Sequence, residues 1–212
     1  MIALAYAKRE LREDFHALLA LDAALGNALR AAVSPQLPQI RLAWWREQLA
    51  SEAQAEPAAD PVIMAIRNAI RRHGVKRGAL VDLVNGWETL LDDWPLSAEL
   101  LLDYARLRGG GLFSAAADVA GIVPDDDCLA AGGLWALADF AKHCSDQSTE
   151  SRARELARAI GAKARQLPKA LRPFAILTRF AERDIAVVSG NGNSPGSPTK
   201  MIQALGFVCW RR

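Results

Sequence analysis

Apolar residues recur at helical spacing along most of the chain, and alternating runs typical of strands extend over no more than a few residues. In the segment 8–32, Leu11, Phe15, Leu18, Leu25 and Leu29 follow one another at intervals of three, four or seven positions, which is typical of one face of an α-helix. The pattern predicts an all-α bundle with helices over 8–32, 38–54, 61–72, 76–92, 98–108, 112–120, 125–144, 151–167 and 170–188.

Turn-forming and capping residues separate these segments. Asp60 can cap a helix that has Pro61 at its first position, Gly74 can end that helix, and Ser97 can cap another. The triple glycine 109–111 either permits a close helix approach or a kink, or lies beside a bound ligand. We expect a single domain over 1–212, with a flexible loop at 189–198 and a short C-terminal helix at 199–209.

The segment 39–49 concentrates bulky and charged residues, with Trp44 and Trp45 next to Arg41 and Arg46. On a helical projection its apolar positions form a band too wide for a surface helix. We therefore expect a deeply packed helix whose arginines lie at the edges of the apolar band.

The composition narrows the class of protein. The 212 residues are 51% hydrophobic and 24% charged, with a net charge of +2, which is ordinary for a globular domain and too weak to argue for nucleic-acid binding. Cys128, Cys144 and Cys209 have no metal-ligand spacing, and their odd number argues against a disulfide framework, so a reducing cytoplasm fits best. No uninterrupted apolar run reaches the length of a spanning helix, and the first residues lack a signal-peptide core.

Two groups of acidic residues are candidate cation sites. Glu88 and Asp92 are four residues apart and would share one face of a helix, so both carboxylates could reach one Mg²⁺ ion; the alternative is a solvated helix end. The acidic triplet 125–127 favours a charged helix N-terminus, because neighbouring positions on a helix point in different directions.

Arginines flank both the tryptophan segment and the triple glycine. Arg41 and Arg46 flank the tryptophans, and Tyr104, Arg106 and Arg108 precede the triple glycine. Arginines that point inward from these positions could clamp a diphosphate through paired hydrogen bonds. Ordinary salt bridges between helices are the alternative.

Three stretches resemble the squalene/phytoene synthase family. Residues 40–49 are similar to its IRLxWWRxxL signature, and 104–112 resembles the YCxxxAGSxG segment that lines the family's pocket. Residues 15–22 resemble the first core helix, and the loop 194–198 with a following short helix resembles bacterial members. The likeness runs in order from 10 to 208.

The resemblance implies an isoprenoid (terpenoid) synthase-like helical bundle. Active members join two prenyl diphosphates head to head, with Mg²⁺ held by two aspartate-rich motifs on facing helices. The metal stabilises the charge of the leaving diphosphate, and an aromatic pocket shields the allylic cation. By this resemblance, the residues expected to contact the substrate are Arg41, Trp45, Arg46, Tyr104 and Arg106, and those expected to hold Mg²⁺ are Glu88 and Asp92.

The chain departs from the family pattern at both aspartate motifs. The first DxxxD motif aligns with Gly26 and Arg30, and the second with His143 and Gln147. Asp22 lies one turn before the first motif, while Asp139 and Asp146 lie near the second motif but out of register. So few acids argue against a site for three magnesium ions.

Two functions follow from the resemblance. The first is a squalene/phytoene synthase-like protein of isoprenoid biosynthesis that binds prenyl diphosphates with doubtful transferase activity, and that needs Mg²⁺ only if it is catalytic. The second is a non-catalytic lipid-binding or assembly factor, because a mitochondrial branch without full aspartate motifs acts in the assembly of respiratory complex I. Either is expected in the cytoplasm, with peripheral membrane contact and a protein partner as further expectations.

Overall fold

The computed structural model describes residues 2–30, 36–51, 60–162 and 167–186, and all regular elements in these ranges are helical. The all-α prediction is therefore confirmed; the predicted loop 189–198 and helix 199–209 lie outside the described residues. The α-helices are α1 (Arg12–Arg30), α2 (Gln36–Ala50), α3 (Pro61–His73), α4 (Arg77–Glu88), α5 (Ala98–Tyr104), α6 (Gly111–Val119), α7 (Asp126–His143), α8 (Gln147–Gly161) and α9 (Arg172–Ala186). Shorter turns are the 3₁₀ segments η1 (Ile2–Tyr6), η2 (Arg9–Leu11), η3 (Thr89–Leu91) and η5 (Lys169–Leu171), and the π-helical segment η4 (Ala105–Gly110).

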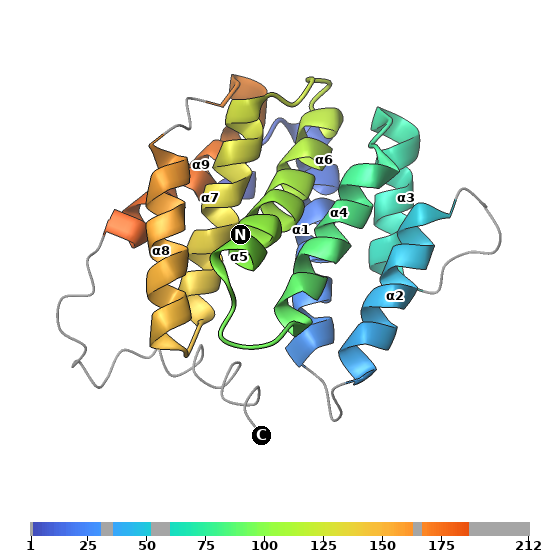
Figure 1. Cartoon of the computed structure of the whole chain (residues 1–212). Helices are drawn as coiled ribbons and strands as arrows, with labels where there is room; N and C mark the ends of the chain where they lie inside the picture. The colour runs from blue at the N-terminus through green and yellow to red at the C-terminus, as the bar shows by residue number, and fades with distance from the viewer. Residues whose placement is uncertain (1, 31–35, 52–59, 163–166, 187–212) are drawn as a thin grey trace.

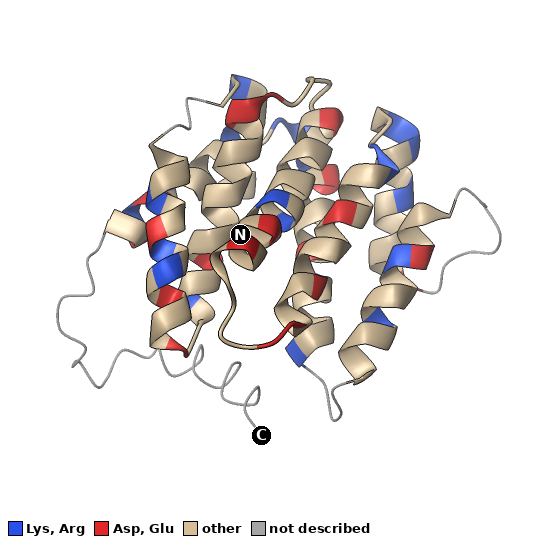
Figure 2. Ribbon diagram, in the orientation of Figure 1, with Lys and Arg blue, Asp and Glu red and all other residues tan. Residues whose placement is uncertain are grey.

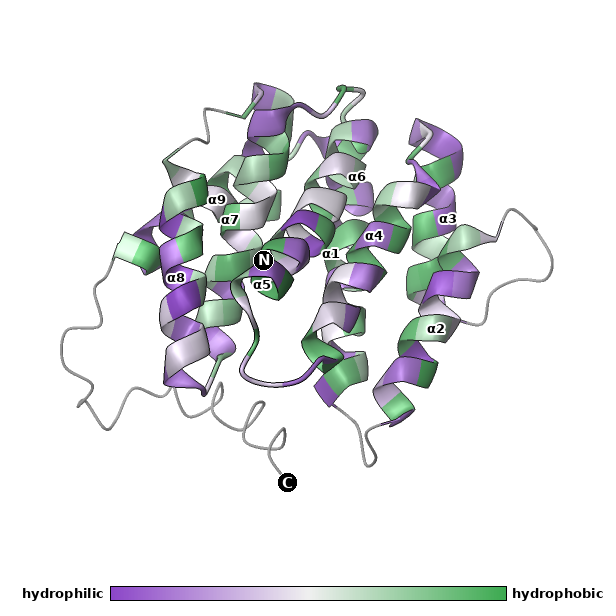
Figure 3. Cartoon of the chain, viewed as in Figure 1, coloured by the Kyte–Doolittle hydropathy of each residue, from purple (hydrophilic) through white to green (hydrophobic). Residues whose placement is uncertain are grey.

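The helices pack around a central group formed by α1, α4, α6 and α7 (Figure 1). α7 contacts η4, α6, α8 and α9, while α4 contacts η4, α6 and α2. α2 and α3 lie along one edge of the bundle and α8 along the opposite edge. Charged residues recur along the outer helix α8, whereas the middle of α7 carries few (Figure 2). Correspondingly, α8 is the more hydrophilic of the two helices (Figure 3).

Three phenylalanines from distant parts of the chain meet in the core. The ring of Phe174 on α9 lies 5.2 Å from that of Phe15 on α1 and 5.1 Å from that of Phe113 on α6, both edge to face. All three side chains are fully buried. Such geometry suits aromatic rings, whose edges and faces carry opposite partial charges.

The predicted caps are confirmed. The Asp60 carboxylate accepts hydrogen bonds from the amides of Val62 and Ile63, and Gly74 ends α3 with a φ of 68°. Ser97 caps α5. The Asp125 carboxylate accepts a hydrogen bond from the amide of Cys128 at 2.8 Å, so the acidic triplet begins a helix. Acidic residues are favoured there because the N-terminal end of the helix dipole is positive.

Several helix boundaries differ from the predicted ones. The segment 8–32 begins with a 3₁₀ turn, and α1 starts only at Arg12. The segment 76–92 is α-helical only to Glu88, after which the chain tightens into η3 and becomes extended at Asp92. α8 starts at Gln147, earlier than predicted, because the side chain of Asp146 caps it.

The prediction of deep packing for the tryptophan helix α2 is wrong. Leu42, Trp45 and Leu49 are buried, but Ile40 is 65% exposed and Trp44 is 42% exposed. α2 lies at the edge of the bundle and packs with α4 and α1, so only one side of its apolar band is covered.

The triple glycine does not interrupt the helix, because α5, η4 and α6 follow one another without a break. A Cβ atom at Gly109 would lie 2.1 Å from the carbonyl oxygen of Gly132 on α7, so these two backbones touch. Close helix approach, one of the two predicted roles, is thus the one the structure shows at Gly109. A π-helical turn is rare and is frequently found at functional sites.

We expect Gly109→Ala to lower the free energy of unfolding by about 1–3 kcal/mol or more, because the methyl group has no room between two backbones. Gly110→Ala is the matched control, since its Cβ would meet nothing closer than 3.7 Å. Helix propensity alone would make the control neutral or stabilising by up to about 1 kcal/mol. Chemical denaturation of both variants checks this, and equal effects would contradict the packing argument.

Candidate functional site

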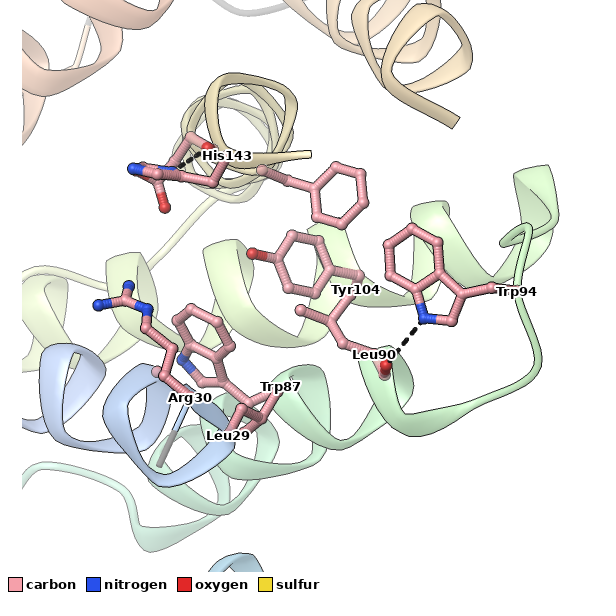
Figure 4. Close-up of a pocket in the computed structure, with 10 residues that line it drawn as sticks. Leu29, Arg30, Trp87, Leu90, Trp94, Tyr104 and His143 are labelled. Atoms are coloured by element: carbon pink, nitrogen blue, oxygen red, sulfur yellow. Dashed lines mark hydrogen bonds and ion pairs between the residues drawn. The ribbon is translucent and has the colours of Figure 1, made fainter. Parts of the chain in front are cut away.

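A pocket of about 480 Å³, its open mouth included, lies between α1, α4 and α7. Its lining comes from α1, from α4 with the turn and loop after it, from α5 and from α7: Gly26, Leu29, Arg30, Trp87, Leu90, Trp94, Tyr104, Asp139, Phe140 and His143. Figure 4 shows Arg30 and His143 towards one end of this lining and Trp94 at the other. The pocket therefore combines a polar end with an aromatic wall.

The aromatic wall is built from rings that pack on one another. Tyr104 lies 5.6 Å from Phe140 and 6.1 Å from Trp87, in both cases near edge to face, while Trp94 stacks on Phe140 at 6.2 Å. These distances fall in the range of favourable aromatic pairs. The wall is therefore supported by rings of the same cluster.

Glycines allow the helices around the pocket to approach closely. A Cβ at Gly86 would lie 2.3 Å from the backbone nitrogen of Arg108, so α4 and η4 are in backbone contact there. A Cβ at Gly26 would lie 3.0 Å from the Trp87 ring. The absence of these two side chains lets the backbone of Arg108 pack against α4 and the ring of Trp87 pack against α1.

Arg108 lies behind the pocket and binds acids from two facing helices. Its Nε and Nη2 each donate to Asp22 on α1 at 2.8 Å, and its Nη1 lies 2.8 Å from the carboxylate of Asp139 on α7. Nη1 also donates to the hydroxyl of Tyr104. Since Arg108 is only 2% exposed, this is a buried ion pair with bidentate geometry on one side.

Aromatic rings enclose the same guanidinium. Its central carbon lies 4.1 Å from the centroid of the Trp87 ring and 4.6 Å from that of Trp135. The indole nitrogen of Trp87 donates to Asp22 at 2.9 Å, which fixes both the ring and the carboxylate. Cation–π contacts of this kind strengthen when water is excluded.

The burial of these groups perturbs their ionisation. Burial alone would lower the pKa of Arg108, but the adjacent Asp22 and the other neighbours outweigh it and raise that pKa. Burial would likewise raise the pKa of Asp139, whereas the charge of Arg108 outweighs it and lowers that pKa. Burial raises the pKa of Tyr104, so its hydroxyl stays protonated. Arg108 and Asp139 are thus both ionised at neutral pH.

The polar end of the pocket carries two basic side chains. Arg30 is at the last position of α1 and donates to Asn27 at 3.2 Å. His143 ends α7, and its Nδ1 donates to the carbonyl oxygen of Asp139 at 2.7 Å, which identifies the ring nitrogen that carries the hydrogen. An anion at this end would meet the guanidinium of Arg30 as a donor from α1.

Among the residues expected to contact substrate, Tyr104 lines the pocket. Trp45 is buried in the core beside α4, and Arg41 donates to the carbonyl of Ala28 at 3.4 Å. Arg106 is 69% exposed and pairs with Asp103 on its own helical run. Apart from Tyr104, these side chains lie outside the pocket lining described above.

Arg46 was expected to contact the substrate and Glu88 to hold Mg²⁺, but the two side chains pair with each other. The Arg46 guanidinium forms an ion pair with Glu88 and donates to Asn85 at 3.0 Å, joining α2 to α4. The prediction that Glu88 and Asp92 share a helix face is wrong, because α4 ends at Glu88 and Asp92 is exposed in extended chain.

For the residues that do gather here, the sequence pattern is a weaker signal. Asp22 stands between Leu18 and Leu25 on the buried stripe of α1, and Arg108 stands four residues after Tyr104 on another buried stripe. A charged residue on an apolar stripe indicates a buried partner of opposite charge. Periodicity cannot name that partner, because the two residues are 86 positions apart.

A comparison with protein-family models identifies the family of this chain. A model of the squalene/phytoene synthase family matches residues 1–167, which is most of the chain. The chain belongs to the squalene/phytoene synthase family. No curated protein and no solved structure matched it. The family is an all-α one with an isoprenoid synthase-like fold, in agreement with the helical bundle.

The magnesium ions implied by the squalene/phytoene synthase family do not fit the residues of this pocket. Gly26, Arg30 and His143, which align with aspartate-motif positions, line it without contributing a carboxylate. The acids one turn away, Asp22 and Asp139, are both bound to Arg108. Within the described ranges, no group of three or more His, Cys, Asp or Glu side chains could hold a metal ion.

The described helices of this squalene/phytoene synthase family member include none that is long and apolar enough to cross a membrane.

Asp22→Asn should lower the free energy of unfolding by about 3–5 kcal/mol, because it removes one carboxylate from a buried pair. The matched control is Asp103→Asn, which removes the same kind of partner from the exposed pair with Arg106 and should cost less than about 1 kcal/mol. Urea denaturation of both variants measures the difference. Similar losses would show that burial does not decide the strength of the Arg108 cluster.

Asp139 should make the free energy of unfolding depend on pH in the acid range. Its pKa is lowered in the folded state, so the unfolded state binds more protons in that range and stability rises with pH. This contribution is complete above the ordinary aspartate pKa of about 3.9 and is lost as the pH falls through the lower folded value. Asp139→Asn should reduce the slope of unfolding free energy against pH below about pH 5. An unchanged slope would contradict the assignment.

Proposed function

We propose that this protein binds a prenyl diphosphate or a related isoprenoid lipid in the pocket and does not release diphosphate by a metal-dependent reaction. One observation carries the proposal: the pocket joins an aromatic wall to a basic end, while the nearby acids are bound to Arg108. The protein would act in isoprenoid metabolism as a binding member of its family.

The wall suits an isoprenoid chain. Small-molecule sites are mostly apolar, have volumes of roughly 300–1,000 Å³ and contain a few polar groups that orient the ligand. Leu29, Leu90 and the rings of Trp94, Tyr104 and Phe140 supply apolar surface, so a branched hydrocarbon chain would gain from burial there.

The basic end suits a phosphate group. An arginine can donate two parallel hydrogen bonds to phosphate oxygens, and Arg30 is at the pocket and exposed enough to do so. His143 adds a second side chain at the same end, held in position through its Nδ1. The guanidinium of Arg30 would thus compensate phosphate charge through a protein cation.

The acids near the pocket support binding over ionisation. A diphosphate leaving group needs strong compensation of its charge as the bond to the allylic carbon breaks. In this pocket the Asp22 and Asp139 carboxylates already compensate Arg108, and the described residues offer no cluster of metal ligands. Mg²⁺ would therefore add little to ligand binding.

An assembly role is the second candidate, and exposed apolar groups on α2 favour it. Ile40 and Trp44 are 65% and 42% exposed on the helix that carries the family signature. Aromatic side chains are enriched at protein interfaces. A protein partner bound there would leave the pocket free for a lipid. The free thiols of Cys128 and Cys144 support the cytoplasmic location proposed for either role.

Binding of farnesyl diphosphate should be detectable by calorimetry in the presence of EDTA and should weaken by about tenfold in Arg30→Gln, which loses a charge-assisted hydrogen bond. Arg71→Gln is the matched control, because Arg71 is also a helix-end arginine that donates to an asparagine three residues earlier, but it lies on α3 outside the pocket lining.

Two results would overturn this function. One is the absence of farnesyl diphosphate binding by the folded protein. The other is magnesium-dependent release of diphosphate, measured by a coupled phosphate assay. Loss of such release in Glu88→Ala or Asp92→Ala would restore the catalytic role expected for those residues from the resemblance.

A further inference from the structure

Asp22 and Asp139 converge on one point from two facing helices. Asp22 is on α1 one turn before Gly26, and Asp139 is on α7 one turn before His143. Gly26 and His143 both line the pocket. Each carboxylate therefore lies one helical turn from a residue that lines the pocket. The two carboxylates flank a single cation, the guanidinium of Arg108.

The guanidinium of Arg108 is contacted by two carboxylates, a hydroxyl group and aromatic rings. Asp22 takes Nε and Nη2, Asp139 takes Nη1, and Tyr104 accepts from Nη1 as well. The faces of the guanidinium lie against Trp87 and Trp135. Four of its five N–H groups are used in these contacts, and an arginine that is 2% exposed lies out of reach of a ligand in the pocket.

The same two carboxylates are of the kind that Mg²⁺ and Mn²⁺ use. Such ions are commonly bound by one or two carboxylates with water completing the shell. Asp139 is 30% accessible and lines the pocket, which would give an ion and its waters a path to the pair. Without Arg108, two like charges would face each other in a buried space, which is costly unless a cation is present.

We propose that Arg108 is a built-in counter-cation that occupies the position of a divalent ion between Asp22 and Asp139. The wild-type pocket is thereby organised without metal. Replacing Arg108 by a shorter neutral residue converts the acid pair into a divalent-cation site. Arg108 is a positioning residue, because it acts on the pocket through Asp22, Asp139 and Tyr104 and not by touching a ligand.

The test uses Mn²⁺ alone as the probe, with no prenyl ligand, so that its failure is distinct from failure of the proposed function. Electron paramagnetic resonance of free Mn²⁺ would be followed during titration of wild type, Arg108→Gln and Asp22→Asn/Arg108→Gln. We expect one Mn²⁺ per chain in Arg108→Gln, bound at least tenfold more tightly than by wild type. The double variant, which lacks one carboxylate, should lose this site.

Each outcome decides the proposal. A wild-type protein that binds one Mn²⁺ as tightly as Arg108→Gln overturns it, and so does a folded Arg108→Gln variant that binds none or a double variant that binds equally well. If Arg108→Gln is unfolded in metal-free buffer, the expected result is that millimolar Mn²⁺ restores its helical circular dichroism signal while leaving Asp22→Asn/Arg108→Gln unaffected. Failure of that recovery overturns the proposal.

Discussion

The pocket depends on a single buried arginine held between two acids. Arg108 joins α1 to α7 through Asp22 and Asp139, and its ring contacts fix Trp87 and Trp135. Burying one charge with two opposite charges is favourable only when nearly all donors are satisfied, and the hydrogen bonds here meet that condition. The spacing of the two helices, and with it the pocket between them, therefore rests on this contact.

The same contact relates the fold to the proposed function. Family membership supplies a helical bundle suited to isoprenoid ligands, but activity depends on what the side chains at the site can do. In this chain the acids face an internal cation, and the basic side chains of Arg30 and His143 face the pocket. The polarity of the site thus favours an anionic ligand held by protein donors, and the aromatic wall favours an apolar chain attached to it.

Local chemistry was enough to predict much of the fold. Asp60, Ser97 and Asp125 begin helices because their side chains satisfy free amides, and this needs no distant partner. Exposure of Trp44 could not be predicted, because it depends on which side of α2 meets the bundle. The site was harder still, since its ion pairs join residues far apart in the chain and the expected pairing of Glu88 with Asp92 required a helix that ends too soon.

The contact between Gly26 and Trp87 has a consequence for how this pocket can change through mutation. A Cβ at position 26 would lie 3.0 Å from the Trp87 ring, so a side chain there requires the indole to shift by a few tenths of an ångström. The same indole lies against the Arg108 guanidinium and donates to Asp22, so this shift would disturb the Arg108 cluster. The effect of a substitution at position 26 therefore depends on the residue at position 87.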